Sequence, residues 1–129
     1  MKPMTVEWVE KAEGDFAIVL RESRARKNPS YDGACFHAQQ CAEKYLKARL
    51  CEAGIEFAKI HDLVALLNQA VEVERGWQRF REDLAYLSDF AVAFRYPGES
   101  ADKPTAADAR QRCRKFRIAA RLALDLDTK

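Results

Sequence analysis

The chain has 129 residues, of which 48% are hydrophobic and 33% are charged. This length is typical of one domain, and this composition excludes a disordered chain because it provides both a hydrophobic core and a charged surface. Five glycines and four prolines are too few for the many turns of a β-sandwich or barrel. The net charge of +2 says nothing about partners. We therefore predict a single helical domain over residues 1–129.

Neither a membrane span nor a disulfide framework is predicted. The longest strictly apolar runs, such as Phe16 to Leu20, have five residues, whereas a membrane span needs about 20. The residues after Met1 lack the apolar stretch of a secretory signal. Four cysteines fall within helical patterns without paired spacing, so we expect a cytoplasmic protein with reduced thiols.

Apolar residues recur at steps of three and four along five segments, and this spacing predicts five α-helices. Because the links between them are short, we expect an all-α fold, an antiparallel up-and-down bundle of four to five helices. The expected helices cover about Thr5–Lys27, Tyr31–Ala53, His61–Glu74, Gln78–Phe94 and Thr105–Leu126.

Residues that commonly cap helices stand at the ends of these segments. Thr5 and Thr105 are placed to accept a hydrogen bond from a free backbone N–H as N-caps. His61 precedes an Asp-Leu helix start, where capping is the more frequent role of a polar side chain. Gly54 follows the second segment and suits the left-handed conformation at a helix C-terminus.

The second and fifth segments have the most informative faces. The second carries two adjacent apolar stripes, which predicts a central helix with Leu46 in the core. The apolar stripe of the fifth consists mostly of small residues, which would let another helix approach closely and favours a two-fold homodimer. The opposite face of the fifth segment is basic and either follows phosphates or is merely solvated. Its arginines are Arg110, Arg114, Arg117 and Arg121.

Asp15 lies on the inward side of the first segment, between Ala12 and Val19. A buried carboxylate requires a partner, and we expect Arg95 first and His37 second. Arg95 stands where a helix ends before a proline. Its guanidinium group could bind a phosphate through two hydrogen bonds or neutralise the C-terminus of the helix.

His37 shares a face of the second segment with Cys41 and Lys44, and Gln40 lies beside them. This face could contact a polar ligand, or His37 could be hydrogen-bonded inside the bundle. His37 and Cys41 offer only two zinc ligands, so we expect no metal site. The sequence has no glycine-rich phosphate loop, and a nucleotide site would therefore use side chains from helices.

Four stretches carry a resemblance to a known family. The most specific is Phe36 to Ala48, within the run Cys35-Phe36-His37-Ala38-Gln39-Gln40-Cys41-Ala42-Glu43-Lys44-Tyr45-Leu46-Lys47-Ala48. The others are Trp8 with Ala12 and Asp15-Phe16, then His61-Asp62-Leu63, and finally Phe94-Arg95-Tyr96-Pro97. In this order they resemble the HEPN domain (higher eukaryotes and prokaryotes nucleotide-binding) over about Trp8 to Leu124.

The resemblance implies a bundle of four or five helices that usually dimerises. Many bacterial and archaeal members are encoded beside a minimal nucleotidyltransferase and form a toxin–antitoxin-like pair with it. Some branches are metal-independent ribonucleases with an active site shared across the dimer. Their signature is an arginine followed four to six residues later by a histidine. No histidine stands at the corresponding positions after Arg95, which are occupied by Tyr96-Pro97-Gly98-Glu99-Ser100-Ala101.

These observations favour a HEPN protein that acts by association, through self-dimerisation, a partner nucleotidyltransferase, a nucleotide or RNA. The candidate ligand-binding residues are Asp15, His37, Gln40, Lys44 and Arg95, and no cofactor or metal is expected. One alternative is a metal-independent ribonuclease that uses Arg95 and His37. Another alternative is a purely structural helical module.

Overall fold

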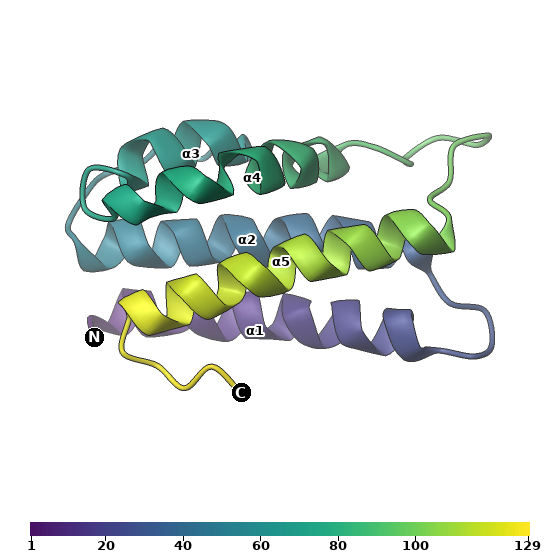
Figure 1. Ribbon diagram of the computed structural model, residues 1–129, viewed down its shortest axis with the longest axis horizontal. Coiled ribbons are helices and arrows are strands. Elements are labelled where there is room, and N and C mark those ends of the chain that lie inside the picture. Colours follow the sequence, from purple (N-terminus) through teal and green to yellow (C-terminus); the bar gives the residue numbers. More distant parts are fainter.

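The computed structural model describes residues 1–129 and contains five α-helices and two short 3₁₀ helices, with no strand. The predicted all-α bundle is confirmed, and it is elongated along its helices (Figure 1). None of the helices is long and apolar enough to span a membrane. The elements are α1 (Pro3–Arg24), α2 (Tyr31–Glu52), α3 (Leu63–Ala70), η1 (Arg75–Phe80), α4 (Arg81–Ser88), η2 (Asp89–Ala91) and α5 (Lys103–Ala123).

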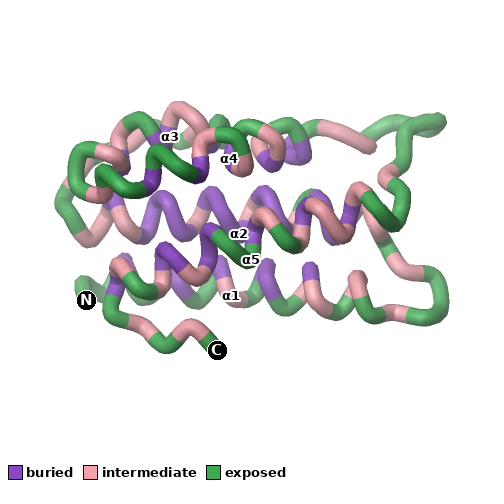
Figure 2. Tube along the Cα trace, in the orientation of Figure 1, coloured by how far each residue is buried: buried purple, intermediate pink, exposed green.

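Helix α2 lies at the centre of the bundle and contacts each of the other four α-helices. Most of α2 is buried (Figure 2), and both of its apolar stripes are covered, with Tyr45 of one stripe and Leu46 of the other fully buried. The prediction of a central second helix with Leu46 in the core is therefore confirmed. Helix α1 packs along one side of α2, and α5 lies across both of them.

The direction of α3 follows from two contacts with α2. Gln39 Nε2 donates to the carbonyl oxygen of His61 at 3.0 Å, and Arg49 Nε donates to Glu74 Oε1 at 2.9 Å. The segment that contains α3 thus runs in the same direction as α2. The chain first returns along the bundle through residues 53–62, where Phe57 packs edge-on against Trp8 at a centroid distance of 6.0 Å.

Three predicted N-caps are wrong, because a neighbouring residue suits each helix start better. Helix α1 begins at Pro3, since proline is favoured in the first turn, and Thr5 is buried and donates instead to Glu52 at 2.9 Å. Asp102 caps α5 by accepting from the Thr105 backbone N–H, and Asp62 rather than His61 caps α3. At the end of α2, Gly54 has a φ of +72°, as the C-cap prediction requires.

The fourth predicted helix is interrupted. Residues 75–91 form η1, α4 and η2, and the chain leaves helical geometry after Ala91. The predicted inward face is correct, since Phe80, Leu84, Leu87 and Phe90 are all buried. Phe94 was expected in the helix, but it has a φ of +64° and stacks on Phe90 with ring centroids 5.8 Å apart.

The small residues on α5 face α2 inside the same chain. Ala106, Ala109, Cys113 and Ala120 are each at most 2% exposed, together with Phe116. Their small size allows the close approach of α2 and α5, which contact each other extensively. The use of this stripe as a dimer surface was therefore a wrong prediction, because it is already covered.

Candidate functional site

Asp15 on α1 lies between the side chains of His37 and Lys44 on α2. Its carboxylate is 2.7 Å from His37 Nδ1 through one oxygen and accepts a hydrogen bond of 2.6 Å from Lys44 Nζ through the other. Asp15 is only 6% exposed, so both contacts compensate the burial of its charge. His37 and Lys44 are seven residues apart, which places them on one face of the helix. His37 was the second expected partner, and the first, Arg95, was wrong.

A second polar cluster continues along α2 from the first. Gln40 Nε2 donates to Gln39 Oε1 at 2.7 Å, and Gln39 Nε2 donates to Glu43 Oε1 at 3.1 Å. Buried Glu43 also accepts from Lys47 Nζ at 3.1 Å and lies 2.8 Å from His61 Nδ1. His61 is therefore held by a carboxylate instead of capping a helix. The i, i+4 spacing of Glu43 and Lys47 was the available signal for this cluster.

Arg95 lies apart from these clusters. Its Nη2 donates to the carbonyl oxygen of Ala91 at 2.6 Å, and the residue is exposed. This hydrogen bond satisfies the backbone carbonyl of the last residue of η2. It agrees with the expectation that Arg95 neutralises the C-terminus of a helix. The structure thus brings Asp15, His37 and Lys44 together with Gln40 nearby, whereas Arg95 makes no hydrogen bond or ion pair with any of them.

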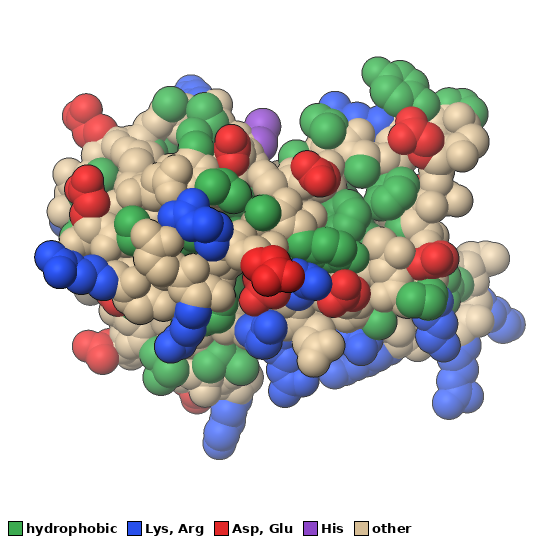
Figure 3. Space-filling model, turned by 45° about the horizontal axis from the view of Figure 1, so that its top comes forward, with side chains coloured by type: hydrophobic (Ala, Val, Ile, Leu, Met, Phe, Trp, Pro, Cys, Tyr) green, Lys and Arg blue, Asp and Glu red, His purple; other side chains and the backbone are tan.

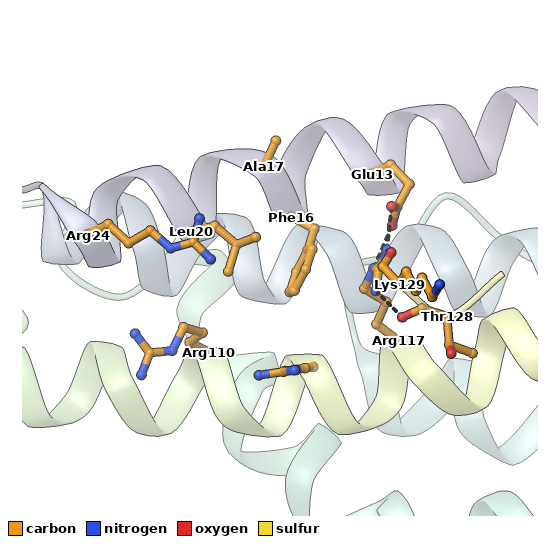
Figure 4. A pocket seen from close by; sticks show the side chains of 10 residues that line it. Glu13, Phe16, Ala17, Leu20, Arg24, Arg110, Arg117, Thr128 and Lys129 are labelled. Carbon is orange, nitrogen blue, oxygen red and sulfur yellow. Dashed lines mark hydrogen bonds and ion pairs between the residues drawn. The ribbon is translucent and has the colours of Figure 1, made fainter.

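A groove of about 590 Å³ lies between α1 and α5, and sequence reasoning did not identify it. Figure 4 shows Arg24 on α1 and Arg110 on α5 reaching into the space between these two helices. Phe16 and Leu20 supply an apolar wall. The complete lining consists of Glu13, Phe16, Ala17, Leu20, Arg24, Arg110, Arg114, Arg117, Thr128 and Lys129.

The four arginines of the basic stripe on α5 differ in whether they have partners within the chain. Arg117 is only 7% exposed and forms two hydrogen bonds with the Glu13 carboxylate, at 2.8 and 2.7 Å. Arg121 donates to the hydroxyl oxygen of Tyr45 at 3.0 Å. In contrast, Arg110 and Arg114 form no ion pair. Arg110 and Arg114, together with Arg24, therefore carry charge in the groove that no carboxylate of the chain neutralises.

Cationic side chains gather at one edge of the molecule in the view of Figure 3. Figure 3 shows Lys and Arg side chains gathered along the lower edge of the molecule, whereas both signs of charge are mixed over the rest of that face. Among the residues that line the groove, Arg24, Arg110 and Arg114 form no ion pair with a carboxylate. Such a site can bind an anion, and it lacks a group that could transfer protons at neutral pH.

Glu13 is the only acidic side chain that lines the groove, and both of its carboxylate oxygens accept hydrogen bonds from Arg117 or Tyr45. Burial acts to raise its pKa, but hydrogen bonds from Arg117 and Tyr45 outweigh burial and hold the pKa below its ordinary value. Tyr45 donates to Glu13 Oε2 at 2.5 Å, and burial raises the pKa of this phenol. Glu13 therefore stays ionised and joins α1, α2 and α5.

Two of the buried cysteines, Cys35 and Cys41, are unreactive thiols. All four are free, and three of them are buried. Burial raises the pKa of Cys35 to about 11 and that of Cys41 well above its usual value, so both remain neutral thiols at neutral pH. No group of three or more His, Cys, Asp or Glu side chains is arranged to hold a metal ion.

The HEPN domain family model matches residues 5–122, a span from α1 almost to the end of α5. This span includes Asp15, the face of α2 with His37 and Lys44, and the arginines of the groove. Comparisons with curated proteins and with solved structures found no match. The resemblance noted in the sequence is confirmed, and the chain belongs to the HEPN domain family.

Proposed function

We propose that this protein acts by association and binds a phosphate-bearing nucleotide in the groove between α1 and α5. The observation that carries this proposal is the set of three arginines without ion-pair partners, Arg24, Arg110 and Arg114. The groove volume of about 590 Å³ is within the usual range for small-molecule sites. Guanidinium groups bind phosphate oxygens through paired hydrogen bonds, which suits an anionic ligand.

Repulsion between the arginines also favours an anion in the groove. Arg110 and Arg114 are one helical turn apart, and like charges at this spacing destabilise a helix by about 0.2–0.5 kcal/mol. Arg24 adds a third positive charge from the facing helix. A bound phosphate group removes this repulsion and gains hydrogen bonds, so its binding stabilises the folded chain.

Removal of two groove charges should weaken nucleotide binding. We expect the double variant Arg110→Gln/Arg114→Gln to bind ADP at least about tenfold more weakly than wild type in titration calorimetry, because two charge-assisted hydrogen bonds are lost. The matched control is Arg21→Gln, which removes an exposed arginine of α1 that does not line the groove. Equal ADP affinity in wild type and in the double variant would refute the groove as the site.

Association with other chains is the second part of the proposal. Support comes from the family, whose members commonly dimerise and are often paired with a minimal nucleotidyltransferase, and from exposed apolar side chains. Val92 is 65% exposed and Tyr96 is 71% exposed, both on the connection between η2 and α5. Two large side chains this exposed on one connection suit contact with another chain.

Light scattering at micromolar concentration should give about twice the chain mass of 14.7 kDa. We expect Tyr96→Ser to shift the distribution toward the monomer, whereas Leu122→Ser changes an equally exposed apolar residue on α5 and serves as a control. A monomer of wild type under these conditions would remove self-association from the proposal. Mass spectrometry of proteins that co-purify with the native chain tests the nucleotidyltransferase partner.

A ribonuclease activity is the alternative, and one observation favours it. Because His37 Nδ1 faces Asp15, its Nε2 is left to accept a proton, as a general base requires. No arginine is bonded within this cluster to stabilise a phosphate. We therefore expect no cleavage of labelled RNA above background without added metal. Cleavage that falls at least about tenfold in both His37→Ala and Arg95→Ala, with the fold intact, would establish the ribonuclease instead.

A further inference from the structure

A small pocket of about 70 Å³ adjoins the groove and shares Arg110 with it. We call it the end pocket. It lies where the C-terminal end of α1 meets the first turns of α2 and α5. Its volume corresponds to about two water molecules, at about 30 Å³ each, so it suits a group as small as a single phosphate. Its lining residues are Ser23, Tyr31, Lys103, Ala106, Ala107 and Arg110.

The polar groups of the end pocket are donors without partners. Ser23 Oγ is buried and has no hydrogen-bond partner, and it is the only buried side-chain polar atom in the chain of which this is true. The Tyr31 hydroxyl and the Lys103 ammonium group take part in no hydrogen bond or ion pair, and no carboxylate lines the pocket. Tyr31 and Lys103 are also the first residues of their helices, whose N-terminal ends carry partial positive charge.

The groove itself offers little recognition of a nucleotide base. Phe16 is the only aromatic residue in its lining and is only 7% exposed. The guanidinium carbon of Arg117 lies over its ring, 4.6 Å from the centroid, and occupies the surface on which a base would stack. Stacking of a base on an aromatic ring contributes about 1–3 kcal/mol where it is available. Binding in this groove therefore depends on phosphate.

The cations continue along α5 from the groove into the end pocket. With a rise of about 1.5 Å per residue, Arg114 and Arg110 are about 6 Å apart along the helix axis, and Lys103 lies about 10 Å beyond Arg110. A single phosphate reaches only the groove arginines. A longer phosphate chain that is bound at Arg110 can reach from the groove into the end pocket, because Arg110 lines both cavities.

We propose that the end pocket binds the terminal phosphate of a nucleoside di- or triphosphate. The affinity of the protein for a nucleotide then increases with the number of phosphates and does not depend on the base. This inference rests on the proposed function, because it extends the same groove. It assigns Lys103, Ser23 and Tyr31 to the terminal phosphate, and Arg110 to both cavities.

Calorimetry with AMP, ADP, ATP, GTP and inorganic triphosphate tests the inference on wild type and two variants. We expect ATP to bind about tenfold more tightly than AMP, and ATP, GTP and triphosphate to bind within about threefold of one another. Lys103→Gln should weaken ATP binding about fivefold and leave AMP binding unchanged. Ser23→Ala should also weaken ATP binding selectively, without lowering the melting temperature of the free protein. Lys27→Gln, an exposed lysine outside both cavities, is the control.

The outcomes separate the two proposals. Equal affinity for AMP and ATP, or equal weakening of both by Lys103→Gln, overturns the end pocket while the groove stands. Binding of ATP without competition from triphosphate also overturns it, because the sugar or base would then carry recognition. If none of these anions binds to wild type, the proposed groove and the end pocket fail together.

Discussion

Leu46→Ala should lower the free energy of unfolding by about 2–5 kcal/mol. Leu46 is fully buried on α2, the helix that contacts all the other α-helices. Loss of its side chain removes apolar contacts and leaves a cavity that several elements would have to close together. Urea denaturation followed by circular dichroism measures the change directly.

The control for this variant is Leu122→Ala, which shortens a leucine that is 64% exposed on the surface of the bundle. We expect its effect to stay within about 0.5 kcal/mol. If Leu46→Ala costs less than about 1 kcal/mol, α2 is not the central helix of the folded protein. The core described for this chain would then be wrong.

Glu13→Ala should lower the free energy of unfolding by about 3 kcal/mol at neutral pH. The change leaves the buried Arg117 guanidinium group without its carboxylate and removes the acceptor of the Tyr45 hydroxyl. The carbonyl oxygens of Thr128 and Lys129 still accept from Arg117, which keeps the loss at the lower end of the range for a broken buried pair. Glu10→Ala is the control, since Glu10 is exposed on the same helix.

Acid should remove this contribution of Glu13. Its pKa in the folded chain lies below the ordinary value of 4.5, so the folded state gains stability from the ionised carboxylate above that pH. The gain is lost as the pH falls from 4.5 through the lowered pKa. We therefore expect wild type and Glu13→Gln to differ in unfolding free energy at pH 7, and this difference to shrink towards pH 3. A difference that is the same at both values would contradict the role of the Glu13 charge.

The sequence predicted the helices because their apolar residues repeat at helical spacing. Tyr45 and Leu46 belong to adjacent stripes of α2, and both are fully buried, as two stripes on one helix require. Helix ends were harder to predict, since several residues near each end can act as caps. The nearby Pro3 and Asp102 determined the starts of α1 and α5 instead of Thr5 and Thr105.

The polar contacts could be predicted only where they lie within one helix or follow from burial. The inward position of Asp15 correctly predicted that its carboxylate is paired, and His37 was one of the two expected partners. The choice of Arg95 failed because periodicity does not tell which helices are neighbours. The groove and the end pocket depend on the approach of α1 to α5 and of three helix ends to one another. The regular spacing of Arg110 and Arg114 gave no indication of the facing Arg24.

The position of the ligand is the central claim, and an NMR titration of ¹⁵N-labelled protein with ADP tests it most directly. We predict that the amide signals that shift belong to residues 16–24 of α1 and 106–117 of α5, which flank the groove. Signals of His37, Gln40 and Lys44 should remain unchanged, because their cluster is satisfied internally around Asp15 and Gln39. Shifts centred on His37 and Lys44, with none along α1 and α5, would contradict the account.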